Sequence, residues 1–458
     1  MDDIFIQIAS YRDPQLIPTL KDLIDKAVTP HNLNIVICWQ HADDETVEMF
    51  IDAGIDILGF EPNESVNSHT VINAEYKSAK IRLIDVSHYD AQGACWARNA
   101  IQQLYSGEKY TLQLDSHHRF VDEWDTKIIL MLESLRYKSK KPVLTAYIPS
   151  FDPDNDPAAR VMVPWKMDFD RFIPEGAVFF LPSSIDEWKT LTEPMRARFY
   201  SGHFAFADGS FAVEVQHDPK YFFHGEEISI AARAFTHGYD LYHPHDLIAW
   251  HEYTRKGRTK VWDDHTTPEK KNGKIQLDWV ERNNACHKRN RILFGMDGED
   301  PSQIDFGKYG FGTARTLREY EEYAGISFKY RAVQQYTIDR NEPVLPVTRN
   351  YTSEDAWRDS MTRSNDVRIC FHKNQLKYPG DDINIPSDFD FWYVAAHDAD
   401  GEIFRKDATE HEIKVYLEND WMDYRLIFLS DRKPIKYIIW PHSKTQGWGE
   451  RFETPITE

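Results

Sequence analysis

The chain has 458 residues, more than a single hydrophobic core usually supports, so we expect one large domain of roughly 250 residues with additions. Hydrophobic residues make up 41% of the sequence and aromatic residues 14%, which excludes general disorder. The formal net charge of -20 excludes long-range attraction to nucleic acid or to anionic membrane, and we expect no nucleic-acid partner.

The N-terminus and the cysteines narrow the class of protein further. The first residues, MDDIFIQIAS, carry two acids where a secretory signal needs cations, and no window approaches the roughly 18 apolar residues of a membrane span. The four cysteines form no Cys-x-x-Cys pair, which argues against a zinc ribbon or a disulfide framework. We expect a cytoplasmic protein without a membrane span, and the sequence leaves its oligomeric state open.

Strand and helix patterns alternate over the first 117 residues. The buried-type strand IFIQIAS is followed by YRDPQLIPTLKDLIDKAV, in which leucines and isoleucines return at helical spacing. Further strands are predicted at 33–40, 80–88 and 109–117, and helices at 43–54 and 94–107. This alternation predicts an α/β fold with a parallel sheet covered on both faces.

The pattern changes beyond about residue 140. In HFAFADGSFAVEV, the alternation split by Asp208-Gly209 predicts a β-hairpin. Residues 266–345 are polar with helical pieces, and after residue 346 short strands with frequent turn signals suggest a β-sandwich. We therefore expect a domain over 1–265, a helical extension packing on it over 266–345, and a β-rich accessory domain over 346–458.

The stretch LQLDSHHRF ends a predicted strand in polar residues. In open α/β sheets, ligands bind beyond the carboxyl ends of the strands. Asp115 and His117 lie two residues apart, so in an extended segment they point to one face and can hold one ion together. The alternative is a strand that leaves the core, where polar residues simply meet water.

Further chemical groups gather between residues 221 and 255. Glu226 and Glu227 open a helix after Gly225, where the helix macrodipole favours carboxylates. They can equally be ordinary acids of a helix start. His251 follows a short apolar stretch and can be either a ligand or a core histidine.

Several stretches, in their order, resemble a known family. They are IASYRDPQLIPTL, GACWARNAIQQLYSGEKYTLQLDSHHRF, HDPKYFFHGEEISIAARAFTHGYDLYHP with WHEYTR, and YGFGTARTLREYEEYAGISF. They resemble the retaining GT-A glycosyltransferases, and in particular the Skp1-type hydroxyproline N-acetylglucosaminyltransferases, which are related to the polypeptide N-acetylgalactosaminyltransferases. The resemblance covers about residues 1–330. It implies a GT-A, Rossmann-like nucleotide-diphospho-sugar transferase domain, followed here by the β-sandwich-like domain.

The resemblance also implies a site. Asp115 and His117 match an Asp-x-His form of the family's metal motif, and His251 matches the histidine that completes it. Glu226 matches the acidic position beside donor sugar and acceptor, although Glu227 can hold that role instead. From the resemblance, Arg12 and Arg98 are expected at the nucleotide, with Ala9, Ser10 and Tyr11 at uracil and ribose. The strand ends place Trp39, Asp115 and Ser116 on the same rim, although a tryptophan there is as often a core residue.

These residues suit the implied reaction. A divalent cation and arginines lower the barrier when they stand where the diphosphate charge develops, and mixed oxygen and imidazole ligands favour Mn²⁺, with Mg²⁺ possible. We expect a UDP-sugar donor, with N-acetylglucosamine as the sugar, transfer with retention, and a protein or glycan hydroxyl as acceptor. The alternatives are a metal-dependent nucleotide or phosphodiester hydrolase and a non-catalytic carbohydrate-binding protein.

Overall fold

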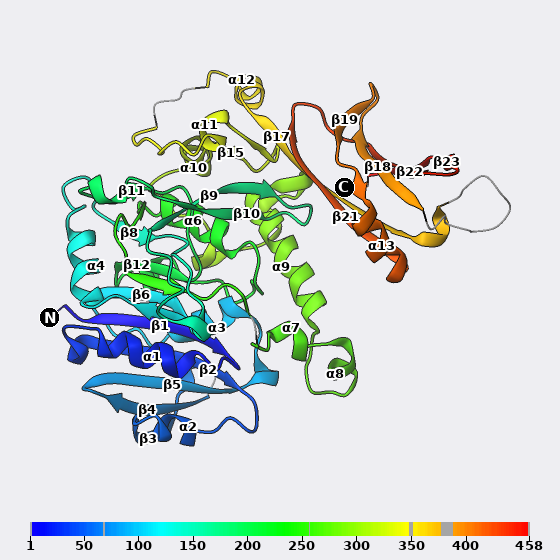
Figure 1. Cartoon of the computed structure of the whole chain (residues 1–458). Helices are drawn as coiled ribbons and strands as arrows, with labels where there is room; N and C mark the ends of the chain where they lie inside the picture. Colours follow the sequence, from blue (N-terminus) through cyan, green and yellow to red (C-terminus); the bar gives the residue numbers. More distant parts are fainter. Residues whose placement is uncertain (1, 67–68, 256, 348–350, 377–387, 457–458) are drawn as a thin grey trace. The chain divides into compact units, whose positions relative to one another are not determined.

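The computed structural model describes residues 2–66, 69–255, 257–347, 351–376 and 388–456 (Figure 1). The chain divides into two compact units. Unit 1 comprises Met1–Phe169, Phe180–Ala324 and Arg340–Arg349, and unit 2 comprises Asp170–Phe179, Gly325–Asp339 and Asn350–Glu458. Among the described residues, no helix combines the length and the apolar character needed to cross a membrane.

Unit 1 is built on a ten-stranded mixed sheet with the order β11-β13-β8-β12-β6-β1-β2-β5-β4-β3. Its strands are β1 (Ile4–Tyr11), β2 (Leu33–His41), β3 (Asp56–Pro62), β4 (Thr70–Tyr76), β5 (Ala79–Ser87), β6 (Tyr110–Asp115), β8 (Pro142–Thr145), β11 (Met195–Arg196), β12 (Phe204–Asp208) and β13 (Asp240–His243). A short pair, β7 (His118–Phe120) with β14 (Ala249–His251), stands outside it. The pair β9 (Trp165–Phe172) with β10 (Val178–Ser184) is divided by the unit boundary, since residues Asp170–Phe179 belong to unit 2.

The helices whose bounds lie in unit 1 are α1 (Leu16–Asp25), α2 (Glu48–Asp52), α3 (Ala94–Gln102), α4 (Trp124–Glu133), α5 (Phe211–Glu214), α6 (Glu226–Thr236), α7 (Val261–Asp264), α8 (Thr267–Lys271), α9 (Trp279–Phe294) and α10 (Leu317–Ala324). The ends of α1 and α2 lie inside the predicted helical stretches, because turns form at Pro14-Gln15 before α1 and at Ala53-Gly54 after α2.

The predicted α/β fold with a central parallel sheet is confirmed. Strands β6, β1, β2 and β5 run parallel to one another. Alternate residues of β1 enter two separate cores: Ile6 packs in the cluster that contains Leu20 of α1, and Phe5 packs in the cluster that contains Ile101 of α3. The period of two in a strand therefore buries both faces of the sheet, one beneath each helix.

The outer strands correct two predictions. The sheet is not parallel throughout, because β12, β4, β3 and β11 pair antiparallel with their neighbours. The hairpin predicted around Asp208-Gly209 is wrong: β12 pairs with β6 and β8, and the chain then enters α5. Gly209 serves close packing, since an added Cβ would lie 1.9 Å from the carbonyl oxygen of Glu108.

Unit 2 contains two sheets: its strands from Thr362 onwards lie where the sequence predicts strands, whereas Ile326–Ser327 and Ala332–Val333 lie in the stretch predicted to be polar with helical pieces. The strands are β15 (Ile326–Ser327), β16 (Ala332–Val333), β17 (Thr362–His372) and β21 (Trp421–Ser430) in one sheet, and β18 (Phe389–His397), β19 (Glu402–Arg405), β20 (Ala408–Thr409), β22 (Lys436–Ser443), β23 (Gly447–Trp448) and β24 (Phe452–Pro455) in another. The helices are α11 (Gln335–Ile338), α12 (Glu354–Asp359) and α13 (Glu410–Glu418). Side chains of both sheets, among them Ile369 and Trp392, share one core. The three-part division of the sequence stays a prediction.

Candidate functional site

Strand pairing brings three of the expected ligands to one end of the central sheet. In the parallel register, Ala9 of β1 stands beside Asp115, the last residue of β6. The chain continues through His117 into β7, which pairs antiparallel with β14 so that His118 faces His251. This pairing carries His251, far away in sequence, to the carboxyl end of β6.

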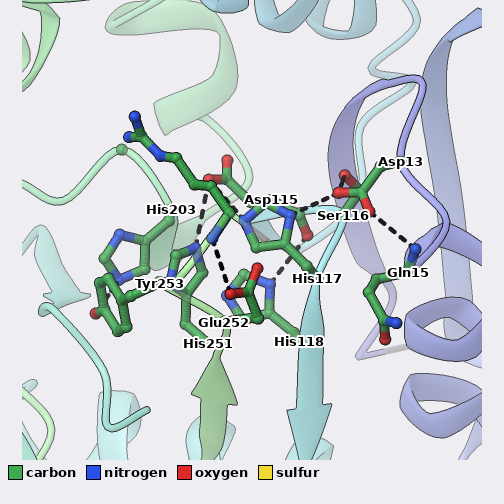
Figure 2. Close-up of polar contacts among 12 residues, drawn as sticks. Asp13, Gln15, Asp115, Ser116, His117, His118, His203, His251, Glu252 and Tyr253 are labelled. Carbon is green, nitrogen blue, oxygen red and sulfur yellow. Dashed lines mark hydrogen bonds and ion pairs between the residues drawn. The ribbon is translucent and has the colours of Figure 1, made fainter. Parts of the chain in front are cut away.

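Asp115, His117 and His251 form a compact group in which one ligand atom of each residue lies within 4.8 Å of the others. Asp115 Oδ2 lies 3.7 Å from Nε2 of His117 and 3.6 Å from Nε2 of His251. Figure 2 shows the three side chains close together, with the ring of His203 nearby. His203 stacks on His251 with ring centroids 4.2 Å apart, so the expected ligands lie among further imidazoles.

The protonation states of this group suit a cation. Burial lowers the pKa of His251 well below its usual value. Burial alone would raise the pKa of Asp115, but His251, Arg98 and His117 hold it well below its usual value. Among the described residues, neither ring nitrogen of His251 has a hydrogen-bond partner. An ionised Asp115 and a neutral His251 are in the state in which such residues ligate metals, so together with the adjacent His117 they fit a divalent cation.

Arg258 places a positive charge beside the same group. Its Nη2 lies 2.9 Å from Oε2 of Glu252, and its Nη1 lies 2.8 Å from Nε2 of His117 and also contacts Nδ1. Nη1 therefore lies against the ring of His117 rather than at one of its nitrogens, and its positive charge would repel a metal ion held by the same histidine.

Arg98 of α3 links this group to Glu226 at the start of α6. Its Nη2 donates to Asp115 Oδ1 at 2.8 Å, and its Nη1 donates to Glu226 Oε1. The other oxygen of Glu226 accepts the thiol of Cys95, which lies one helical turn before Arg98. Gly202 permits this approach, because an added Cβ there would lie 2.3 Å from Glu226 Oε1. Glu226 is therefore buried and held at both oxygens.

Glu227 has a different environment from that of its neighbour. It is only partly buried, and it accepts hydrogen bonds from the backbone of Gly202 and from the hydroxyl of Tyr147, both at 2.8 Å. Burial raises the pKa of Glu227 to about 7, with the charge of Glu226 adding to the rise and both hydrogen bonds opposing it. A carboxyl with this pKa exchanges its proton near neutral pH.

The residues expected at the nucleotide fall into two groups. Tyr11 and Arg12 both contact Asp264, the tyrosine hydroxyl at 2.7 Å and the guanidinium at 2.9 Å. Arg12 has a φ of 44°, an uncommon backbone conformation for a residue other than glycine. Ser10 is buried and, among the described residues, its hydroxyl has no hydrogen-bond partner. These side chains are brought to the same end of the sheet as Asp115.

Trp39 lies in the hydrophobic core instead. It is 3% exposed and packs edge-on against Phe50, with ring centroids 5.2 Å apart. Ser116 also turns inwards, since its hydroxyl donates to Asp13 at 2.7 Å. Ala9 is partly buried and packs against the core that contains Phe5.

Sequence reasoning missed several residues of the site, among them Asp13, Cys95 and Arg258. Asp13 directly follows Ser10-Tyr11-Arg12 at the carboxyl end of β1. This position, where ligands of α/β sheets bind, could have identified it as a candidate. Cys95 precedes Arg98 by three residues, and in the helix predicted there this spacing places both side chains on one face. Arg258 lies in a loop after β14, where no periodic pattern predicts its partners.

A second group, Cys95, His217 and Glu226, also places ligand atoms within 4.8 Å of one another. Its members already have partners, because Cys95 donates to Glu226 and His217 Nε2 lies 2.6 Å from Gln113 Oε1. This group fits a metal ion less well than Asp115, His117 and His251 do.

Comparison with known proteins gives a family match. A model of the family described as "Glycosyltransferase (GlcNAc)" matches residues 3–330, which is more than half of the chain. No protein with curated annotation shows a significant match.

Solved structures give weaker likenesses. GalNAc-T7 with UDP, GalNAc and Mn²⁺ aligns over 99% of this chain and 80% of its own, at 10% identity and a TM-score of 0.47. TarS of S. aureus in complex with UDP-GlcNAc aligns over 64% and 73%, at 10% identity and a TM-score of 0.34. The mannosyltransferase PcManGT from Pyrobaculum calidifontis, in complex with GDP-Man and Mn²⁺, aligns over 56% and 58%, at 9% identity and a TM-score of 0.35. All three TM-scores lie below 0.5.

Proposed function

Because the chain belongs to the GlcNAc glycosyltransferase family, we propose that it moves N-acetylglucosamine from a UDP-sugar to a hydroxyl of a protein or glycan, with retention at the anomeric carbon. The observation that supports this most is the group of Asp115, His117 and His251 at the carboxyl end of β6. An α/β sheet binds its ligands at this end.

The proposed cation ligands are Asp115, His117 and His251. One oxygen and two imidazole nitrogens favour Mn²⁺ over Mg²⁺, which prefers oxygen ligands throughout. When bound, the cation supplies positive charge for the diphosphate that leaves the sugar. The protein carries a net charge of -20, so cations at the site also offset its repulsion of an anionic donor.

The chain's own residues position and stabilise the substrates. Arg98 is buried between Asp115 and Glu226, and it holds both carboxylates in fixed positions. Both oxygens of Glu226 already accept hydrogen bonds, one from Cys95 and one from Arg98. In this proposal, Glu226 keeps the guanidinium of Arg98 beside Asp115, where the diphosphate would bind. Glu227 is the more exposed of the two, and its protonation near neutral pH lets it hydrogen-bond a sugar or acceptor hydroxyl in either direction.

The deprotonation of the acceptor is assigned to the leaving phosphate. The carboxylates of Asp115 and Glu226 are both paired with Arg98. This pairing makes them poor nucleophiles towards the sugar. A front-face displacement requires no such nucleophile. It needs the acceptor hydroxyl and the leaving oxygen on one side of the sugar, where the phosphate accepts the proton.

The proposal is tested by the release of UDP from a panel of UDP-sugars in the presence of Mn²⁺ and of candidate protein and glycan acceptors. The wild type is compared with Asp115→Ala and with Asp43→Ala, which removes an exposed carboxylate of the same unit. We expect selective turnover of UDP-N-acetylglucosamine that falls at least 100-fold in Asp115→Ala and is unchanged in Asp43→Ala. Equal turnover in all three proteins, or no turnover of any UDP-sugar, would overturn the proposal.

A further inference from the structure

We propose that Asp13 is a positioning residue of the cation site, which fixes the proton of His117 on Nδ1 so that Nε2 is free to ligate. This inference rests on the proposed function, because it assumes that His117 ligates a cation. Asp13 has no part in the ligand group itself, and its role is to act through His117.

The contacts of Asp13 support this role. Asp13 follows the end of β1 and is 7% exposed. Its Oδ1 accepts the backbone N–H of Gln15 at 2.8 Å, and its Oδ2 accepts the hydroxyl of Ser116 at 2.7 Å. The same Oδ2 lies 2.7 Å from Nδ1 of His117, and Figure 2 shows Asp13 facing both residues. An ionised carboxylate only accepts hydrogen bonds, so Nδ1 must carry the proton.

The other nitrogen of the ring has the complementary surroundings. Nε2 of His117 lies on the side of the ligand group, 3.7 Å from Asp115 Oδ2. Arg258 Nη1 contacts both ring nitrogens of His117 and lies nearer to Nδ1 than to Nε2, so this contact selects neither tautomer. The position of the proton is argued from Asp13, whose carboxylate oxygen is the acceptor at Nδ1.

A purely structural role for Asp13 predicts something else. Asp13 also lies 3.4 Å from Arg258 Nη1, and its bond to Gln15 stabilises the turn that leads into α1. If these contacts were its whole purpose, loss of its charge would change stability and leave the His117 tautomer as it is. The distance to Nδ1 is the shorter by 0.7 Å, which favours the histidine as the main partner.

Asp13→Asn separates the two roles. The asparagine oxygen can keep the bond to Gln15, but its amide group then faces Nδ1 of His117 and donates to it. This reverses the tautomer and puts a proton on Nε2, the nitrogen that should ligate. Loss of the group that hydrogen-bonds the other ring nitrogen of a ligating histidine typically weakens metal affinity about 10- to 100-fold, and we expect a loss of about that size for Mn²⁺.

The experiment measures Mn²⁺ binding by the electron paramagnetic resonance signal of the free ion, in the full-length wild type and in Asp13→Asn. Asp125→Asn is the control, because Asp125 is a buried carboxylate that caps backbone N–H groups at Val28 and Thr29. It should lose stability but keep its Mn²⁺ affinity. In parallel, ¹⁵N-histidine labelling reads the tautomer of His117 without metal, with His117→Gln for assignment.

The outcomes separate this inference from the proposed function. A 10- to 100-fold weaker affinity in Asp13→Asn, together with a proton that moves from Nδ1 to Nε2, supports the positioning role. Equal affinities in wild type and variant, or an unchanged tautomer, overturn the inference and leave the cation site standing. A wild type that binds no Mn²⁺ overturns the cation site and this inference with it.

Discussion

Replacing Glu227 by glutamine should make the stability of the protein less sensitive to pH. Glu227 is partly buried, and burial raises its pKa from 4.5 to about 7, assisted by the charge of Glu226. The folded state therefore keeps the proton at pH values where the unfolded chain has lost it. By linkage, this group stabilises the fold at low pH, and its contribution is lost as the pH rises from about 4.5 to about 7.

The size of the effect follows from the pKa. A change from 4.5 to about 7 corresponds to about 3 kcal/mol, at 1.36 kcal/mol for each pKa unit. About 2.5 kcal/mol of this falls between pH 5 and pH 8. Glutamine has no proton to lose, and it can still accept from Gly202 and donate to Tyr147. The stability of Glu227→Gln relative to wild type should therefore improve by about 2.5 kcal/mol from pH 5 to pH 8.

The assay is urea unfolding of both proteins at pH 5 and pH 8, monitored by circular dichroism. The double difference is the change in the free energy of unfolding from pH 5 to pH 8 in Glu227→Gln, minus the same change in wild type. Tyr147→Phe is the matched control: it removes a hydrogen bond that lowers the pKa of Glu227, so it should move the sensitive range to higher pH. A double difference near zero between Glu227→Gln and wild type would refute the reasoning.

Three further substitutions test the contacts of the site. Gly202→Ala places a Cβ 2.3 Å from Glu226 Oε1, so thermal melts should show a loss of about 1–3 kcal/mol and UDP release should fall at least tenfold. Arg98→Lys cannot bridge two carboxylates as a guanidinium does, and kcat should fall about 100-fold at unchanged fold by circular dichroism; an unchanged kcat would contradict the bridge. Arg258→Ala removes a competing cation from His117, so calorimetry without nucleotide should show tighter Mn²⁺ binding, whereas weaker binding would show that Arg258 supports the site.

The central sheet could be predicted from the sequence because its strands are buried on both faces. Runs such as IFIQIAS have few polar residues and stand between amphipathic helices, so their length and flanks define them. The antiparallel flanks could not be predicted in this way. Strand β12 has the same local pattern as a hairpin strand, and only its pairing with β6 and β8 distinguishes the two.

The same contrast holds for the site. Asp115 and His117 could be selected as candidates because they stand together at a strand end, and the structure places His251 beside them. The pairing of Arg98 with Asp115 and Glu226 depends on three elements that are distant in sequence. The core position of Trp39 had the same cause, because it depends on packing against Phe50 of α2. Local sequence does not report such tertiary contacts.

The most direct test of the proposed site is thermal stabilisation by UDP, with and without Mn²⁺, in wild type and in His251→Ala. A ligand that binds only the folded protein raises Tm in proportion to its binding free energy. If Asp115, His117 and His251 hold a cation that anchors the diphosphate, UDP should raise the Tm of the wild type by several degrees only when Mn²⁺ is present. His251→Ala should lose this increase. An equal increase without Mn²⁺, or an unchanged increase in His251→Ala, would contradict the account.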